Sequence, residues 1–277
     1  MKNLKNLKHL VLSLVLISFT AACSSDDDAP APDDDPVTEK RVKEFKLRVT
    51  ENNSGSDWNE ESSIYDYNPD GKMTKIVKKN VSSISSENFE HRFNINYNND
   101  GTVQNLAYEL TDEGVSGLVN FGYTGGKLSA ISDSEFSIPI NYHAATNSFT
   151  YQLDAELDVD TIYFNSSNDI VRHASAIYGT SQLTTNSNEG VYNNTSLNQE
   201  LKIYFAMREG GMANNNFYQT KELTKMVISG QTILGPIEDP YIFDVVNLVR
   251  NSDGLIESYA YAEDFEEDFA FQITYTD

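Results

Sequence analysis

The chain has 277 residues, with 42 acidic and 20 basic side chains and a formal net charge of −22 at pH 7. This charge argues against nucleic-acid binding and against electrostatic docking on anionic lipid, because both need clustered lysine and arginine. A single cysteine, Cys23, excludes an intrachain disulfide and a zinc site built on several thiolates. We therefore expect a fold stabilised by burial alone, with no nucleic-acid partner.

Residues 1–22 have the pattern of a secretion signal. Lys2, Lys5 and Lys8 precede a short apolar segment from Leu10 to Phe19, and small residues lead to Cys23. The apolar segment is shorter than the roughly 20 residues that a membrane-spanning helix needs. The arrangement resembles bacterial lipoprotein signal peptides, and this resemblance implies that Cys23 carries a lipid. An ordinary signal peptide followed by an unrelated cysteine is the alternative.

An acidic segment with several prolines follows over residues 23–38. Asp26-Asp27-Asp28 and Asp33-Asp34-Asp35 cannot contribute to a packed core, so we predict an extended tether. Serine followed at once by acidic residues is also similar to the surface-export signal of Bacteroidota lipoproteins. That similarity implies the outer face of the outer membrane. A solvated spacer on a lipoprotein that faces the periplasm is the alternative.

Residues 39–277 are predicted to form a single all-β domain. Trios of alternating apolar residues that end in an aromatic residue recur along it: Phe93-Ile95-Tyr97, Val119-Phe121-Tyr123, Ile138-Ile140-Tyr142, Leu201-Ile203-Phe205 and Phe271-Ile273-Tyr275. A period of two places each trio on one face of a strand. We expect an antiparallel β-meander of repeated hairpins, curled into a barrel-like roll or a sandwich, with little helix.

Three of the predicted turns share the sequence Asn-x-Asp-Gly. Their defining residues are Asn68, Asp70 and Gly71; Asn98, Asp100 and Gly101; and Asn251, Asp253 and Gly254. The asparagine and aspartate can hydrogen-bond the local backbone, and the glycine suits the positive φ of a bulged turn. The apolar pair after the first turn, Met73 and Ile76, differs in parity. We therefore predict a β-bulge after each glycine that returns both side chains to one face.

The segment from Tyr67 to Ile76 resembles the tyrosine–aspartate (YD) repeat of the Rhs and wall-associated proteins. The chain is similar to Bacteroidota lipoproteins of unknown function that carry a short, degenerate run of these hairpins. The resemblance covers most of residues 65–277 and is specific at three or four hairpins. Departures such as Tyr123-Thr124-Gly125-Gly126, which is one residue short, favour a small closed sheet over a long shell. The resemblance implies a fold and not a function.

Two polar stretches interrupt the hairpin pattern, Gly179–Gln199 and Met207–Thr220. Long polar insertions in a compact β domain are loops or places where function resides.

After Asp239-Pro240 we predict a strand from about Val245 in preference to a short helix.

Four aromatic residues in polar surroundings are the candidate ligand-binding residues, as an exposed platform for stacking sugars: Trp58, Tyr192, Phe217 and Tyr218. For Trp58, packing on the edge of the sheet is the alternative.

The sequence shows no recognisable catalytic or metal-binding motif. His91, His143 and His173 lack metal-ligand spacing, so we predict structural or surface histidines, no metal and no cofactor. Two acidic groups stand out: Asp154, Glu156, Asp158 and Asp160, predicted to alternate on one strand face, and Glu263, Asp264, Glu266, Glu267 and Asp268. Paired carboxylates can hydrolyse glycosides, but chance proximity is expected among so many acids.

We therefore predict a protein that is not an enzyme. The sequence favours a lipid-anchored lipoprotein of the outer membrane or cell surface, attached to the membrane through Cys23, which acts as a non-catalytic binding or accessory module. A glycan or another envelope protein is the expected partner. A structural or adhesive module is the alternative, followed by a carboxylate-dependent glycoside hydrolase.

Overall fold

The computed structural model describes residues 39–51, 57–84, 88–195, 197–209, 218–232, 235–262 and 267–276. Cys23 and the predicted tether lie outside these ranges. The elements are β1 (Val42–Glu51), β2 (Trp58–Tyr67), β3 (Met73–Ser82), β4 (Phe89–Tyr97), β5 (Val103–Leu110), β6 (Val115–Thr124), β7 (Lys127–Ser132), β8 (Ser137–Pro139), β9 (Asn141–His143), β10 (Ser148–Tyr151), β11 (Asp160–Phe164), β12 (Ile170–Ser175), β13 (Gly179–Glu189), α2 (Gln199–Glu209), β14 (Lys221–Thr232), β15 (Gly235–Arg250), β16 (Ile256–Ala262) and β17 (Glu267–Tyr275). The strand predicted from about Val245 lies within β15.

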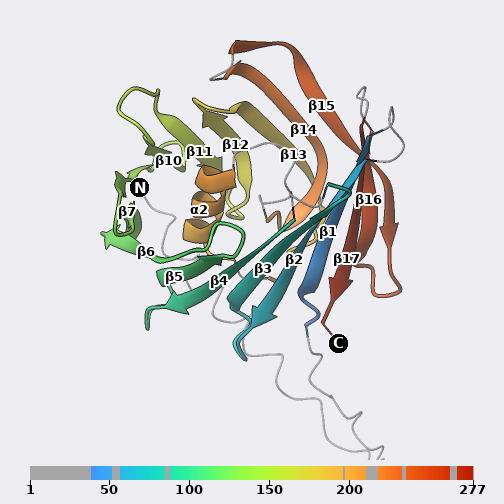
Figure 1. The fold of residues 1–277 in the computed structure, drawn as a ribbon, viewed down its shortest axis with the longest axis horizontal. Coiled ribbons are helices and arrows are strands. Elements are labelled where there is room, and N and C mark those ends of the chain that lie inside the picture. Colours follow the sequence, from blue (N-terminus) through green and yellow to red (C-terminus); the bar gives the residue numbers. More distant parts are fainter. Residues whose placement is uncertain are drawn as a thin grey trace, which may run out of the picture. The chain divides into compact units, whose positions relative to one another are not determined.

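The strands pair antiparallel in chain order, and the last strand returns to the first (Figure 1). β8 and β9 are consecutive pieces of one segment joined through Ile140. The first piece pairs with β7 and the second with β10. The sheet is therefore a nearly closed antiparallel barrel. This confirms the predicted all-β meander and selects the barrel over the sandwich.

The predicted β-bulges are confirmed. Tyr67 pairs with Met73 while Asp66 pairs with Lys75, so Thr74 is the extra residue on β3. Met73 and Ile76 consequently face the same way, and both are fully buried. Equivalent register shifts follow the turns that precede β5, β7, β12 and β16. The bulge therefore sets which face of each hairpin points into the barrel.

The three Asn-x-Asp-Gly turns adopt the predicted geometry. Gly71, Gly101 and Gly254 have φ angles of +78°, +87° and +79°. In each turn the glycine N–H donates to the carbonyl of the leading asparagine, at 2.9 to 3.0 Å. The turn between β11 and β12 repeats this geometry without a glycine, because Asn168 takes the same place with φ +60° and donates to the carbonyl of Asn165. A fourth turn therefore belongs to the series.

The tyrosine before a turn ties its hairpin to the previous one. Each hydroxyl donates to the carbonyl of the first residue in the preceding strand: Tyr67 to Val42 (2.6 Å), Tyr97 to Met73 (2.6 Å), Tyr123 to Val103 (2.7 Å) and Tyr275 to Ile256 (2.8 Å). Burial raises the pKa of Tyr67 to about 12. This recurring bond gives the tyrosine of three trios a structural role, whereas the Tyr142 hydroxyl donates to Asn147 Oδ1 at 3.2 Å.

The Leu201-Ile203-Phe205 trio was predicted to be a strand, and that prediction is wrong. These residues lie in helix α2, which occupies the interior of the barrel (Figure 1). Every residue from 201 to 207 is buried, and Phe205 packs edge-on against Phe93 of β4, with ring centroids 5.5 Å apart. Inside a ring of paired strands no strand edge is available as a partner. A helix is favoured there because it satisfies its own backbone hydrogen bonds.

The stretch Gly179–Gln199, predicted as an insertion, begins as β13 and then enters the barrel.

Among the described residues, no helix is long and apolar enough to span a bilayer.

Candidate functional site

A cavity of about 340 Å³ lies between α2 and the inner faces of β5 to β8. It is at the end of the barrel opposite the Asn-x-Asp-Gly turns, since the β7–β8 turn forms part of its wall. Its lining is mainly apolar and includes Tyr108, Val119, Ile131, Asp133, Phe136, Ile138, Leu153, Tyr204, Met207 and Arg208. Its volume is at the lower end of the range for small-molecule sites.

Strand alternation brings the cavity wall together. Ile131 of β7 pairs directly with Ile138 of β8, so the two side chains share the inner face. Tyr108 of β5 pairs with Gly117 of β6, and a Cβ on Gly117 would overlap the Tyr108 hydroxyl. The absence of a side chain at Gly117 leaves room for the tyrosine ring across β6. Phe136, in the β7–β8 turn, is 40% exposed and forms part of the rim.

Two charged residues line the cavity, and they differ in their partners. Oδ1 of Asp133 accepts the backbone N–H groups of Glu135 (2.7 Å) and Phe136 (2.9 Å), which closes the β7–β8 turn. Arg208, in the last turn of α2, is exposed, and its guanidinium carbon lies 6.0 Å from the centroid of the Tyr108 ring. Within the described ranges no carboxylate pairs with Arg208. The arrangement is a small apolar cavity with one cationic group available.

No local sequence pattern pointed to this cavity, and its described wall contains neither Trp58 nor Tyr192 nor Tyr218. Tyr192 and Tyr218 are 3% and 1% exposed, so the expectation of an exposed platform at these positions is wrong. The polypeptide around them folds into the barrel, where Tyr192 shares a 3.0 Å hydrogen bond with the hydroxyl of Tyr65. Phe217 lies outside the described residues.

Trp58 is partly exposed at the start of β2. Thr50 and Trp58 are paired across β1 and β2, and the Arg48 guanidinium carbon lies 5.0 Å from the indole centroid. Arg48 and Thr50 alternate with the buried Leu47 along β1, so Trp58 lies on the outer face of the barrel. It is far in the sequence from every residue lining the cavity and makes no part of its wall.

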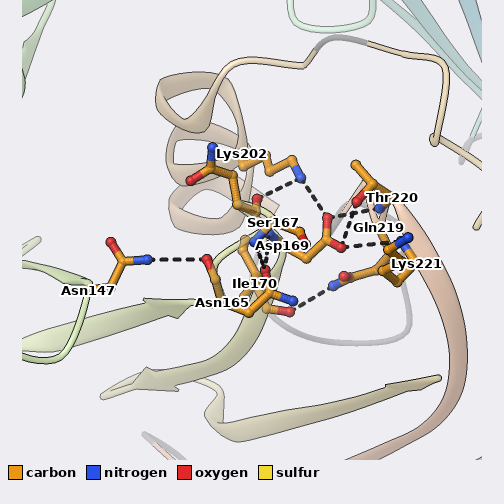
Figure 2. A network of polar contacts seen from close by, with 10 residues as sticks. Asn147, Asn165, Ser167, Asp169, Ile170, Lys202, Gln219, Thr220 and Lys221 are labelled. Carbon is orange, nitrogen blue, oxygen red and sulfur yellow. Dashed lines mark hydrogen bonds and ion pairs between the residues drawn. The ribbon is translucent and has the colours of Figure 1, made fainter. Parts of the chain in front are cut away.

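A buried ion pair anchors α2 at the opposite end of the barrel (Figure 2). The Lys202 ammonium donates to Asp169 Oδ1 at 3.1 Å and to the carbonyl of Asn168 at 2.9 Å. Asp169 also accepts the Thr220 N–H (2.8 Å), the Thr220 hydroxyl (2.8 Å) and the Lys221 N–H (3.2 Å). The carboxylate thus joins the β11–β12 turn, α2 and the start of β14. Burial lowers the pKa of Lys202, and the Asp169 charge opposes that shift.

A second buried polar group lies on β10 to β12. Nε2 of His173 is 2.9 Å from the Tyr151 hydroxyl, and Asp160 accepts the Ser175 hydroxyl at 3.0 Å. His173 is 1% exposed, and burial lowers its pKa to about 4. It follows Ile170 by three residues, as Ile76 follows Met73, so the bulge turns it inward. The three-residue spacing between Ile170 and His173, which matches that between Met73 and Ile76, was therefore the signal in the sequence that His173 is buried.

The predicted alternation of carboxylates on one strand face is wrong. Asp154, Glu156 and Asp158 lie in the connection between β10 and β11, where Asp154 Oδ1 accepts the Glu156 N–H at 2.9 Å. Asp160 alone is in a strand, and it is buried. In the second acidic group, Glu263, Asp264 and Glu266 lie outside the described residues.

The other two histidines lie at opposite ends of the barrel. His143 is exposed on β9, and its Nε2 is 3.0 Å from the Thr150 hydroxyl. His91 Nε2 is 2.8 Å from Asp112 Oδ1, and together with Glu113 these residues bring three possible metal ligands within 4.8 Å of one another. Asp112 and Glu113 are exposed turn residues, and such groupings are common without a metal.

Comparisons with known proteins leave the family open. The sequence matches no model of a known protein family, and no curated protein matches it. Among solved structures, the chain is similar to a porin-like protein from Bacteroides uniformis, with a TM-score of 0.48 and 13% sequence identity. The similarity covers 85% of this chain and 96% of that protein.

Proposed function

We propose that this chain is a lipid-anchored, non-catalytic binding protein of the bacterial cell envelope and that it binds a small, mostly apolar molecule in the cavity beside α2. The observation that carries this proposal is the cavity itself, which is walled by aromatic and aliphatic side chains from four strands and the helix. Among its described lining residues Asp133 is the one carboxylate, and its Oδ1 atom is held by the turn. A carboxylate pair for hydrolysis has no support here.

Attachment to the membrane is assigned to the lipid on Cys23. A barrel inserted in a bilayer carries an apolar outer band. Here the outer faces of β3 to β5 carry a ladder of ion pairs, in which Lys79 meets Glu90 at 3.0 Å and Arg92 meets Glu109 at 3.1 Å. Such a face is suited to water. The acidic residues after Cys23 support display on the outer face of the outer membrane.

The hairpins support a relationship to YD repeats. Four turns share one backbone geometry, and four tyrosine hydroxyls bond the preceding hairpin in the same way. These features give the YD-like tyrosine and turn residues a physical role. They carry no information about the ligand.

Dye binding tests the proposal. We expect the chain from Ser24 onward to bind the neutral apolar dye N-phenyl-1-naphthylamine saturably. Ile138→Trp, which fills the cavity, should weaken binding by about tenfold or more, since a lost apolar contact of about 1.4 kcal/mol is a factor of ten. Leu118→Trp is the matched control, because Leu118 is 45% exposed on the neighbouring β6 and is not part of the cavity wall. Equal binding by both variants would exclude the cavity as the site.

Glycan binding at Trp58 is the second candidate function. The partial exposure of the indole on the outer face of β2 favours it. A glycan array with wild type and Trp58→Ala tests it, and a hit that persists in Trp58→Ala would contradict this assignment. If no glycan on the array binds, a protein becomes the favoured partner, and a pull-down from envelope proteins would identify it.

A further inference from the structure

We infer that the cavity ligand is an amphipathic anion: an apolar body of small size that ends in one carboxylate, which Arg208 binds at the mouth of the cavity. The inference rests on the proposed function and specifies the class of ligand. The apolar body is indicated by the mainly apolar wall, in which Ile131, Ile138 and Met207 offer no hydrogen-bonding group. The polar groups of the lining come from Tyr108, Tyr204, Asp133 and Arg208.

The head group is indicated by the partners of the two charged residues. Asp133 already accepts two backbone N–H groups through Oδ1. Arg208 has no carboxylate partner among the side chains that the structure describes. A guanidinium presents several N–H donors in a fixed plane and binds a carboxylate through two of them at once. Arg208 is therefore the group that selects the charge of the ligand.

Tyr108 and Gly117 position this guanidinium. The Tyr108 ring lies across Gly117, under Arg208, with the guanidinium carbon 6.0 Å from the ring centroid. Arg172 over Tyr163 repeats this contact at 5.3 Å in β11 and β12, away from the cavity. Contact with a tyrosine ring alone thus does not distinguish Arg208. Its position at the end of an apolar cavity does.

Arg208 also has a possible structural role, because a cation in the last turn of α2 complements the helix dipole. That structural role does not depend on the charge of a ligand. The experiment therefore has to compare an anionic and a neutral ligand with apolar chains of the same length.

Displacement of N-phenyl-1-naphthylamine by octanoate and by 1-octanol, in wild type and Arg208→Gln, makes this comparison. We expect octanoate to displace the dye from wild type at a concentration several-fold to about tenfold lower than octanol, since the ion pair is partly exposed to solvent. Arg208→Gln should abolish that preference and leave displacement by octanol unchanged. Arg172→Gln is the matched control and should keep the preference.

The outcomes separate the two proposals. Equal displacement by octanoate and octanol in wild type, an unchanged preference in Arg208→Gln, or no displacement by either compound would overturn the amphipathic anion while leaving an apolar site in place. Dye binding that Ile138→Trp does not weaken would overturn the site itself.

Discussion

Single residues in this barrel are selected by backbone conformation and by burial. The glycine of each Asn-x-Asp-Gly turn has a positive φ, which a side chain with a Cβ rarely adopts. Asn168 tolerates the same conformation because asparagine is among the few residues that enter the left-handed region. The turn chemistry is thus local and readable from four residues.

Gly71→Ala should lower the free energy of unfolding by about 1 kcal/mol or more because of its φ of +78°. A Cβ at this position would also approach the Arg41 guanidinium, whose Nη2 atom lies 2.5 Å from it. Gly254→Ala is the matched control, since its φ is +79° and no atom lies within 4 Å of the added Cβ. Urea denaturation measures the free energy of unfolding of both variants. If Gly71→Ala is as stable as wild type, the turn assignment fails.

His173 should make the stability pH-dependent. The histidine pKa is 6.5 in the unfolded chain and about 4 in the folded protein, so the unfolded state binds more protons between these values. The free energy of unfolding should therefore fall by about 3 kcal/mol in total as the pH drops from about 6.5 to about 4. Burial raises the pKa of Asp160, which acts in the opposite direction and is present in both proteins compared below.

Unfolding of wild type and His173→Gln across this pH range isolates the histidine contribution. The variant should lose stability less steeply on acidification than wild type does. His143→Gln removes an exposed imidazole and serves as the control. Parallel profiles for wild type and His173→Gln would show that His173 is not buried in its neutral form.

At the scale of elements, α2 is the one described helix, and a buried carboxylate ties it to the β11–β12 turn and to the start of β14. Asp169 and Lys202 are 0% and 2% exposed. A buried charge that loses its partner is strongly unfavourable, because its desolvation is no longer compensated. We therefore expect the ion pair to help fix the position of α2 in the barrel.

Asp169→Asn should lower the free energy of unfolding by about 3 kcal/mol or more, since it leaves the Lys202 ammonium buried and uncompensated. Asp253→Asn breaks the exposed Lys40–Asp253 pair, in which the side chains are 44% and 47% exposed, and should cost less than about 1 kcal/mol. Adding Lys202→Met to Asp169→Asn should recover part of the loss. Equal stability of the two single variants would contradict the anchoring role.

At the scale of the whole molecule, the described strands form a nearly closed ring. The pairing of β17 with β1 leaves no long unpaired strand edge at this junction of the described barrel. Strand addition at the β1–β17 junction is disfavoured for this reason. The proposed site is instead a cavity at one end of the barrel.

Cys23→Ser should release the protein from the membrane fraction, because a lipid on this residue is the proposed attachment. Fractionation followed by immunoblotting measures the release. Wild-type protein on intact cells should be digested by added protease if it is displayed on the surface. Protection of the protein in intact cells would place it on the periplasmic side, and membrane partitioning of Cys23→Ser would refute the lipid anchor.

The sequence by itself determined the features that depend on neighbouring residues. Alternation such as Phe93-Ile95-Tyr97 encodes a strand face, and Asn-x-Asp-Gly encodes a bulged turn, because both depend on local backbone geometry. Together they predicted the all-β meander and the burial of pairs such as Met73 and Ile76.

Only the tertiary structure decided what fills the barrel and where the cavity lies. The alternation of Leu201, Ile203 and Phe205 is that of a strand, but enclosure inside a ring of paired strands makes a helix the better solution. Tyr192 and Tyr218 lie in polar sequence but are buried, because the segments that carry them also run inside the barrel. The cavity wall combines Tyr108, Ile138 and Arg208, which are remote in sequence. Their proximity depends on how the ring closes around α2, and no local pattern encodes that closure.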